Sequence, residues 1–151
     1  MKKYKKILVV PAITVIVVSI LSGFASSDTD KTAINLIKER TNILQKSFYG
    51  QMSLQEAERR LSHIQTYPLL SQDIQNIREW ETGDLDIIRR MNIAEFEQEM
   101  NFMNYITYRA VIYWDMTGLS GNYTEKGTYH VVLKRENELY KLSVFEPINE
   151  K

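Results

Sequence analysis

The chain has 151 residues, of which 44% are hydrophobic, 25% charged and 11% aromatic, and this is the composition of one packed globular domain. It contains no cysteine, which excludes disulfide bonds, thiol catalysis and cysteine-ligated metal sites. Nineteen basic residues balance nineteen acidic ones, but four lysines lie within the first six residues; without them, 15 basic residues stand against 19 acidic ones, a net charge of −4. This mildly acidic body argues against a nucleic-acid partner, because such binding depends on neutralising phosphates.

The first segment of the chain combines a basic start with an uncharged apolar run over residues 7–24, preceded by Lys2, Lys3, Lys5 and Lys6. As a helix, these 18 residues would be roughly 27 Å long, close to the roughly 30 Å hydrocarbon core of a bilayer. The lysines favour the cytoplasmic side, so the rest of the chain is expected outside the cell membrane.

Two interpretations of this segment stay open. It is either a retained single-pass membrane anchor or a signal peptide cleaved after Ala25, because Gly23 and Ala25 are small residues at the spacing that signal peptidase prefers. We therefore divide the chain into residues 1–27, a signal peptide or membrane anchor, and residues 28–151, an extracytoplasmic domain that is secreted if the segment is cleaved.

Three amphipathic helices are predicted at the start of this domain. Apolar side chains at spacings of three and four predict a helix over about residues 29–49, ended by Gly50. The sequence from Ser53 to Glu56 has the form of a capping box and predicts a second helix that ends before Pro68. We expect Ser71 to cap a third helix that stops near Gly83.

The second half of the domain has the pattern of strands. Apolar and polar residues alternate over 94–102, which predicts a strand. The same stretch also fits a helix whose apolar side would consist of Ile93, Phe96, Met100 and Met103. Residues 105–116 are apolar on both faces and predict a central strand, followed by a loop over 117–122. Residues 127–135 and 139–145 then flank a polar turn as a hairpin. The predicted class is α+β, with three helices packed on an antiparallel sheet of about four strands.

The last hairpin carries a resemblance to a known group of proteins. Residues 129–134, a polar turn and residues 139–145, with Tyr140-Lys141-Leu142 in the final strand, resemble the last hairpin of the NTF2-like superfamily of cystatin-like folds. The resemblance implies a curved sheet wrapped around helices, with a conical cavity between them. Some members of the superfamily are isomerases or dehydratases. Many others, including membrane-anchored parts of Gram-positive conjugation and sporulation assemblies, perform no chemistry.

Residues with catalytic or metal-binding chemistry are few. Asp115 follows an apolar strand and either acts as a general base in the cavity, beside a tyrosine such as Tyr108 or Tyr129, or begins the next loop and caps a turn. The acidic residues of the 94–102 segment either bind a hard cation or guard a sheet edge; they are Glu95, Glu97 and Glu99. His63 and His130 lie too far apart in sequence to form a two-histidine metal motif. We therefore expect no catalytic residue, no metal and no cofactor.

Aromatic residues are concentrated between Phe96 and Phe145, and a sheet of four strands cannot bury all of them. The binding candidates are Tyr105, Tyr108, Tyr123 and Tyr129. The leading hypothesis is a non-catalytic extracytoplasmic domain that docks onto a protein of a bacterial envelope assembly of the conjugation, secretion or sporulation type. The alternative is a small-molecule binder or isomerase-like enzyme that uses a carboxylate in the cavity.

The N-terminal segment, residues 1–27, predicts where the protein lies in the cell. Cell fractionation should recover the full-length chain in the membrane, with its body digested by protease added from outside, because the lysine-flanked apolar run is long enough to span a bilayer. A mature protein that begins at Ser26 would establish the signal peptide instead, and recovery in the cytosol would contradict both interpretations.

Overall fold

The structure, a computed structural model, describes residues 27–80 and 86–148. The chain divides into two compact units, Met1–Lys31 and Thr32–Lys151. The predicted membrane run over residues 7–24 lies outside the described residues. Among the residues that are described, no helix is both long and apolar enough to cross a membrane.

In the first unit, the described residues contain the start of a helix, which Ser27 and Asp30 cap by two reciprocal hydrogen bonds. The Asp30 backbone N–H donates to the Ser27 hydroxyl at 3.1 Å, and the Ser27 N–H donates to the Asp30 carboxylate at 2.9 Å. These two bonds satisfy donors that a helix N-terminus otherwise leaves unpaired.

The three predicted helices are present: α2 (Asp28–Phe48), α3 (Leu54–Ile64) and α4 (Leu69–Glu79). Ser53 caps α3 as expected, because its hydroxyl accepts a hydrogen bond from the Glu56 N–H at 3.2 Å. The expected cap of α4 was wrong. The helix begins at Leu69, directly after Pro68, and not at Ser71. Proline suits this position because its fixed φ is close to the helical value and its missing N–H would have no partner there.

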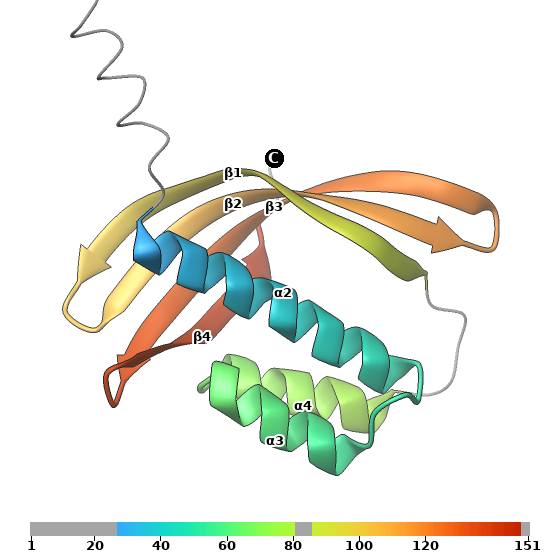
Figure 1. Ribbon diagram of the computed structural model, residues 1–151, viewed down its shortest axis with the longest axis horizontal. Helices are drawn as coiled ribbons and strands as arrows, with labels where there is room; N and C mark the ends of the chain where they lie inside the picture. Colours follow the sequence, from blue (N-terminus) through green and yellow to red (C-terminus); the bar gives the residue numbers. More distant parts are fainter. Residues whose placement is uncertain (1–26, 81–85, 149–151) are drawn as a thin grey trace, which may run out of the picture. The chain divides into compact units, whose positions relative to one another are not determined.

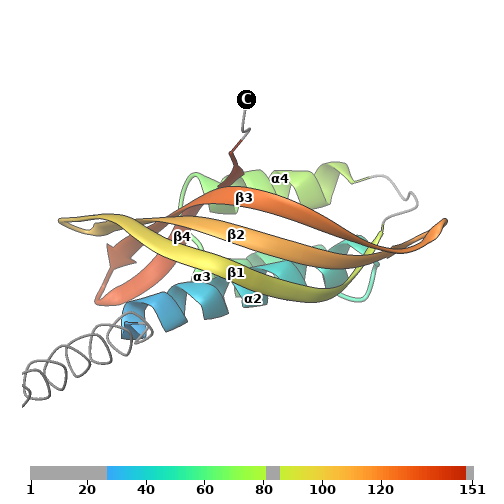
Figure 2. The ribbon, with the colours of Figure 1, turned by 90° about the horizontal axis from the view of Figure 1, so that it is seen from above.

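The sheet is an antiparallel meander of four strands in the order β1-β2-β3-β4. The strands are β1 (Ile87–Phe102), β2 (Tyr105–Gly118), β3 (Gly121–Glu136) and β4 (Leu139–Pro147). The sheet is curved, and α2, α3 and α4 lie on one of its faces (Figures 1 and 2). The α+β class is therefore confirmed.

The strands are longer than the sequence predicts. β1 begins at Ile87, and the helical alternative for residues 93–103 was wrong. Three register shifts interrupt its pairing with β2, one of them between Ile93 and Glu95. At each shift β1 has one residue more than β2, and beyond it the side chains that face the helices come from the other set of alternate positions. One alternating pattern of apolar and polar residues therefore cannot run along the whole strand. The expected loop over 117–122 is reduced to a short turn, because Thr117 pairs with Asn122 and its hydroxyl donates to the Asn122 side chain at 2.7 Å.

Two apolar clusters form the core. The larger lies between α2 and the inner face of the sheet and includes Tyr108 and Trp114; the smaller packs α2 against α3 around Ile43 and Leu61. The outer edge of β4 is covered by the connection between α3 and α4, where the Thr66 N–H donates to the Leu142 carbonyl at 2.9 Å. The Ser143 hydroxyl donates to the Tyr67 carbonyl at 3.0 Å in the same region.

A buried ion pair joins the helices. Arg40 of α2 donates one hydrogen bond to each carboxylate oxygen of Asp73 in α4, both at 2.7 Å. Gln65, at the end of α3, donates a further bond to the same carboxylate at 2.5 Å. Asp73 is only 2% exposed, so these three bonds replace its hydration.

Replacing Asp73 with alanine should lower the free energy of unfolding by about 3–5 kcal/mol, because Arg40 would keep a buried charge without its partner. Chemical denaturation of the two proteins measures the difference. Glu39→Ala is the matched control: it removes an exposed ion pair with Arg60 at 3.8 Å and should cost less than about 1 kcal/mol. Equal losses in the two variants would contradict a structural role for the buried pair.

Candidate functional site

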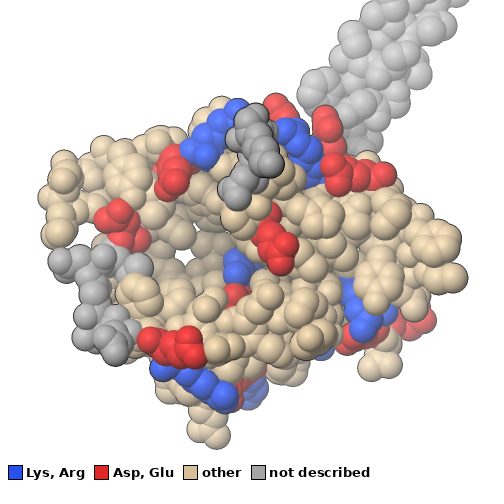
Figure 3. All heavy atoms as spheres, turned by 180° about the vertical axis from the view of Figure 1, so that it is seen from behind, with Lys and Arg blue, Asp and Glu red and all other residues tan. Residues whose placement is uncertain are grey.

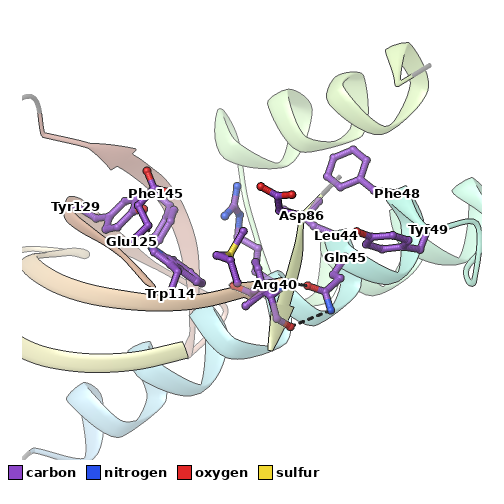
Figure 4. A pocket seen from close by; sticks show the side chains of 13 residues that line it. Arg40, Leu44, Gln45, Phe48, Tyr49, Asp86, Trp114, Glu125, Tyr129 and Phe145 are labelled. Carbon is purple, nitrogen blue, oxygen red and sulfur yellow. Dashed lines mark hydrogen bonds between the residues drawn. The ribbon is translucent and has the colours of Figure 1, made fainter. Parts of the chain in front are cut away.

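A cavity of about 360 Å³ lies between α2 and the part of the sheet where β2 and β3 meet their turn. Its walls come from the C-terminal half of α2, the residues at the start of β1, two positions each on β2 and β3, and one position on β4. Figure 3 shows the surface hollowed between helices and sheet, and Figure 4 shows the side chains that line the space. The cavity combines apolar walls with a few polar groups, which is typical of ligand sites.

A connected set of aromatic side chains forms the sheet side of the cavity. The Trp114 indole N–H donates to the Tyr129 hydroxyl at 2.9 Å, and the two rings meet edge to face with centroids 6.0 Å apart. Tyr129 also stacks on Phe145 with centroids 4.7 Å apart. Burial raises the pKa of the Tyr129 hydroxyl, so this group stays protonated over the physiological range.

Glycine at position 127 makes room for this arrangement. A Cβ at Gly127 would lie 2.6 Å from the Tyr129 hydroxyl oxygen and from the ring carbon Cε2. Because residues two apart on a strand share a face, only glycine lets the Tyr129 ring lie along its own strand.

The side chain of Gln45 links α2 to the start of β1. The Ile88 N–H donates to Gln45 Oε1 at 2.9 Å, and Gln45 Nε2 donates back to the Ile88 carbonyl at 3.3 Å (Figure 4). β1 is an edge strand, so these backbone groups of Ile88 have no neighbouring strand to bond with, and Gln45 supplies the partners instead. The bonds also keep Asp86, two residues earlier, at the border of the cavity.

Asp86 accepts a hydrogen bond from the Tyr123 hydroxyl on β3. This bond, together with partial desolvation and the negative charge of Asp86, raises the pKa of Tyr123 to about 12. Gly118 leaves room for the Asp86 carboxylate in this position, because a Cβ at residue 118 would overlap with it and displace it.

The four tyrosines proposed from the sequence occupy different environments. Tyr123 and Tyr129 lie on the same face of β3, the second inside the cavity and the first beside its border. Tyr105 lies on the opposite face of the sheet, next to the β1–β2 turn, and is 42% exposed. Tyr108 is fully buried and stacks on Phe96, so it belongs to the core.

Both interpretations of Asp115 were wrong. The residue lies within β2, and its carboxylate accepts a hydrogen bond from the Thr124 hydroxyl at 2.8 Å. Its neighbour Trp114 points toward the helices, and side chains alternate along a strand, so Asp115 points to the outer face of the sheet. It therefore lies neither in the cavity nor in a loop.

The remaining acidic and histidine candidates also lie outside the cavity. Glu95 is 3.7 Å from Arg109, and Glu99 is 3.9 Å from His130, both on the outer side of the sheet. Within residues 27–80 and 86–148, no three side chains of His, Asp or Glu gather as metal ligands.

Sequence reasoning missed Arg40, Asp86 and Glu125 as cavity residues. The sequence marks these three residues only weakly. Arg40 is one of several polar residues on an amphipathic helix. Asp86 and Glu125 lie outside the strands predicted over 94–102 and 127–135, which are shorter than the real ones. Their proximity arises only when β1, β2 and β3 pair.

Comparisons with known proteins assign no family to the chain. No protein family matches the chain, and no curated protein sequence matches it at a significant level. Among solved structures, it is similar to the solution NMR structure of a de novo designed β-sheet protein. The TM-score is 0.44 and the sequence identity 14%, over 78% of this chain and 90% of that chain. This resemblance assigns neither a family nor an activity.

The Asp86–Tyr123 hydrogen bond gives a spectroscopic prediction. At about pH 11, Tyr123 should remain protonated in the wild type, because Asp86 raises its pKa to about 12 from the ordinary 10.0, and should be largely ionised in Asp86→Asn. Titration of ¹³C-labelled tyrosine by NMR distinguishes the two states. Glu125→Gln removes a weaker electrostatic effect on the same hydroxyl and should lower the pKa less. An unchanged Tyr123 titration in Asp86→Asn would contradict the bond.

Proposed function

We propose that this chain is a non-catalytic extracytoplasmic domain that docks onto a protein partner of a bacterial envelope assembly, exported or anchored by residues 1–27. The observation that carries the proposal is an exposed apolar surface at the β1–β2 turn. We call it the hairpin patch and define it as Met100, Phe102, Met103 and Tyr105.

The hairpin patch is apolar, contiguous and unusually exposed. Phe102 and Tyr105 pair directly across the hairpin, and Met100 is two residues from Phe102 on the same strand, so all three lie on the outer face of the sheet. Their exposed fractions are 60%, 42% and 49%, and Met103 at the tip is 83% exposed. Exposed apolar side chains that gather in this way are typical of protein interaction sites.

A pair of charged residues borders the hairpin patch. Lys134 pairs with Tyr105 across β2 and β3 and forms a 2.8 Å ion pair with Glu136. This ion pair lowers the pKa of Glu136 and raises that of Lys134, so both groups are charged at neutral pH. An apolar centre with aromatic residues and a polar rim has the composition of a docking interface.

The NTF2-like superfamily is the proposed fold family. The order of three helices followed by a meander, and a cavity enclosed between helices and sheet, support this assignment. Its non-catalytic, membrane-anchored members are consistent with the lysine-flanked leader.

Small-molecule binding or an isomerase-like activity is the second candidate, and the cavity itself favours it. A base for such an enzyme would have to be Asp86 or Glu125, since Asp115 faces the opposite side of the sheet.

The docking proposal predicts the effect of substitutions in the hairpin patch. The double variant Phe102→Ala/Tyr105→Ala should weaken complex formation at least about tenfold, because a single aromatic anchor can contribute about 2 kcal/mol or more to an interface. Crosslinking in intact cells, followed by quantification of the crosslinked partner, measures this loss.

Two control variants make the result specific. Tyr113→Ala removes another exposed tyrosine from the same face of β2 and should leave the complex intact, as should Asp115→Asn. Retained crosslinking in the double variant, or its loss in Asp115→Asn with the fold preserved, would argue for a different function.

A further inference from the structure

The cavity is lined by aromatic rings on two sides. Trp114, Tyr129 and Phe145 belong to the sheet, whereas Phe48 is the last residue of α2 and Tyr49 directly follows it (Figure 4). The faces of aromatic rings carry negative electrostatic potential and attract organic cations, most strongly where water is partly excluded. Leu44 and Met116 add aliphatic surface between the two groups of rings.

The charged groups of the lining are not balanced. Arg40 contacts the cavity, but both oxygens of Asp73 lie 2.7 Å from its guanidinium, so this pair contributes no net charge. The guanidinium also lies over the ring of Phe145, 4.9 Å from its centroid. Asp86 and Glu125 line the same cavity, and neither forms an ion pair with any residue of segments 27–80 and 86–148.

The two carboxylates lie at the open side of the cavity. Both residues are exposed, whereas Trp114 is 9% exposed at the inner wall. Figure 3 shows acidic side chains around the hollow and basic atoms within it. A ligand that enters the cavity therefore meets apolar surface within and negative charge at the entrance.

We propose that this cavity binds a ligand with an apolar body and a cationic group, of the class of organic ammonium or guanidinium compounds. The apolar body contacts Leu44, Met116 and the aromatic wall. The cation lies near Asp86 and Glu125, where ring faces and carboxylates both attract it. An anionic ligand of the same shape would be repelled by these two carboxylates, which have no ion-pair partner within residues 27–80 and 86–148. The site is separate from the hairpin patch.

A series of three probes of nearly equal size tests the proposal: phenylbutylamine, phenylbutanol and phenylbutanoate. The full-length chain is held in lipid nanodiscs, with empty nanodiscs as the blank, and carries Trp80→Phe so that Trp114 is its single tryptophan. Fluorescence of Trp114 measures affinity. The NMR signal of its indole N–H, which donates to Tyr129, reports whether the probe enters the cavity.

We expect phenylbutylamine to bind at least about tenfold more tightly than phenylbutanoate, with phenylbutanol between them. Added sodium chloride should weaken binding of the amine and leave that of the alcohol unchanged, which tests the charge effect without any substitution.

Charge-removing variants locate the cation. Asp86→Asn/Glu125→Gln should lower the affinity for phenylbutylamine about threefold to tenfold, as expected for two exposed charges. Glu146→Gln is the matched control and should have no effect, because Glu146 is exposed and lies opposite His130 in the β3–β4 register, on the outer side of the sheet. The hairpin-patch double variant should also bind the amine normally, so failure of this proposal and failure of the docking proposal are distinguishable.

Three results would each overturn the proposal: no saturable binding of phenylbutylamine at millimolar concentration, equal affinity for the three probes, or wild-type affinity in the variant that lacks both carboxylates.

Discussion

The buried ion pair between Arg40 and Asp73 is the interaction on which the arrangement of this domain depends. Removing two charges from water is costly, and the cost is offset only when geometry and additional hydrogen bonds are favourable. Here each carboxylate oxygen accepts a bond from Arg40, and Gln65 supplies one more. Because these residues come from α2, α4 and the end of α3, the carboxylate is fully bonded only when all three helices are in place.

Arg40 also links the three helices to the sheet through its contact with Phe145. Its guanidinium lies over Phe145, Phe145 stacks on Tyr129, and the Tyr129 hydroxyl accepts from Trp114. A continuous series of contacts thus leads from the helix layer through β4 and β3 to β2. The cavity wall is part of this series, and Arg40 itself lines the cavity, so the charge pair helps to fix the shape of the wall. A rigid wall lowers the entropic cost of binding, because few side chains must be ordered by the ligand.

Features that depend on neighbouring residues could be predicted from the sequence, and features that depend on strand pairing could not. The Ser53 cap, the polar turn before Leu139 and the helix over residues 29–49 are local, and the structure confirms them. The length of β1 was hidden because its register shifts break the alternation, and the orientation of Asp115 required knowing that Trp114 faces inward. Asp73 and Arg40 are 33 residues apart, and no local pattern marks them as partners.

The two edges of the sheet differ in a way that limits how the domain can assemble. The Thr66 backbone and the Ser143 hydroxyl close the edge at β4, whereas β1 at the other edge carries three register shifts and the carboxylates Glu95, Glu97 and Glu99. An added strand needs a straight row of free backbone groups, and both irregular pairing and repeated like charges oppose it. Strand addition from another chain is therefore disfavoured at either side. Recognition of this domain has to use side chains, which ties the choice of partner to the identity of particular residues and protects the sheet against templated polymerisation.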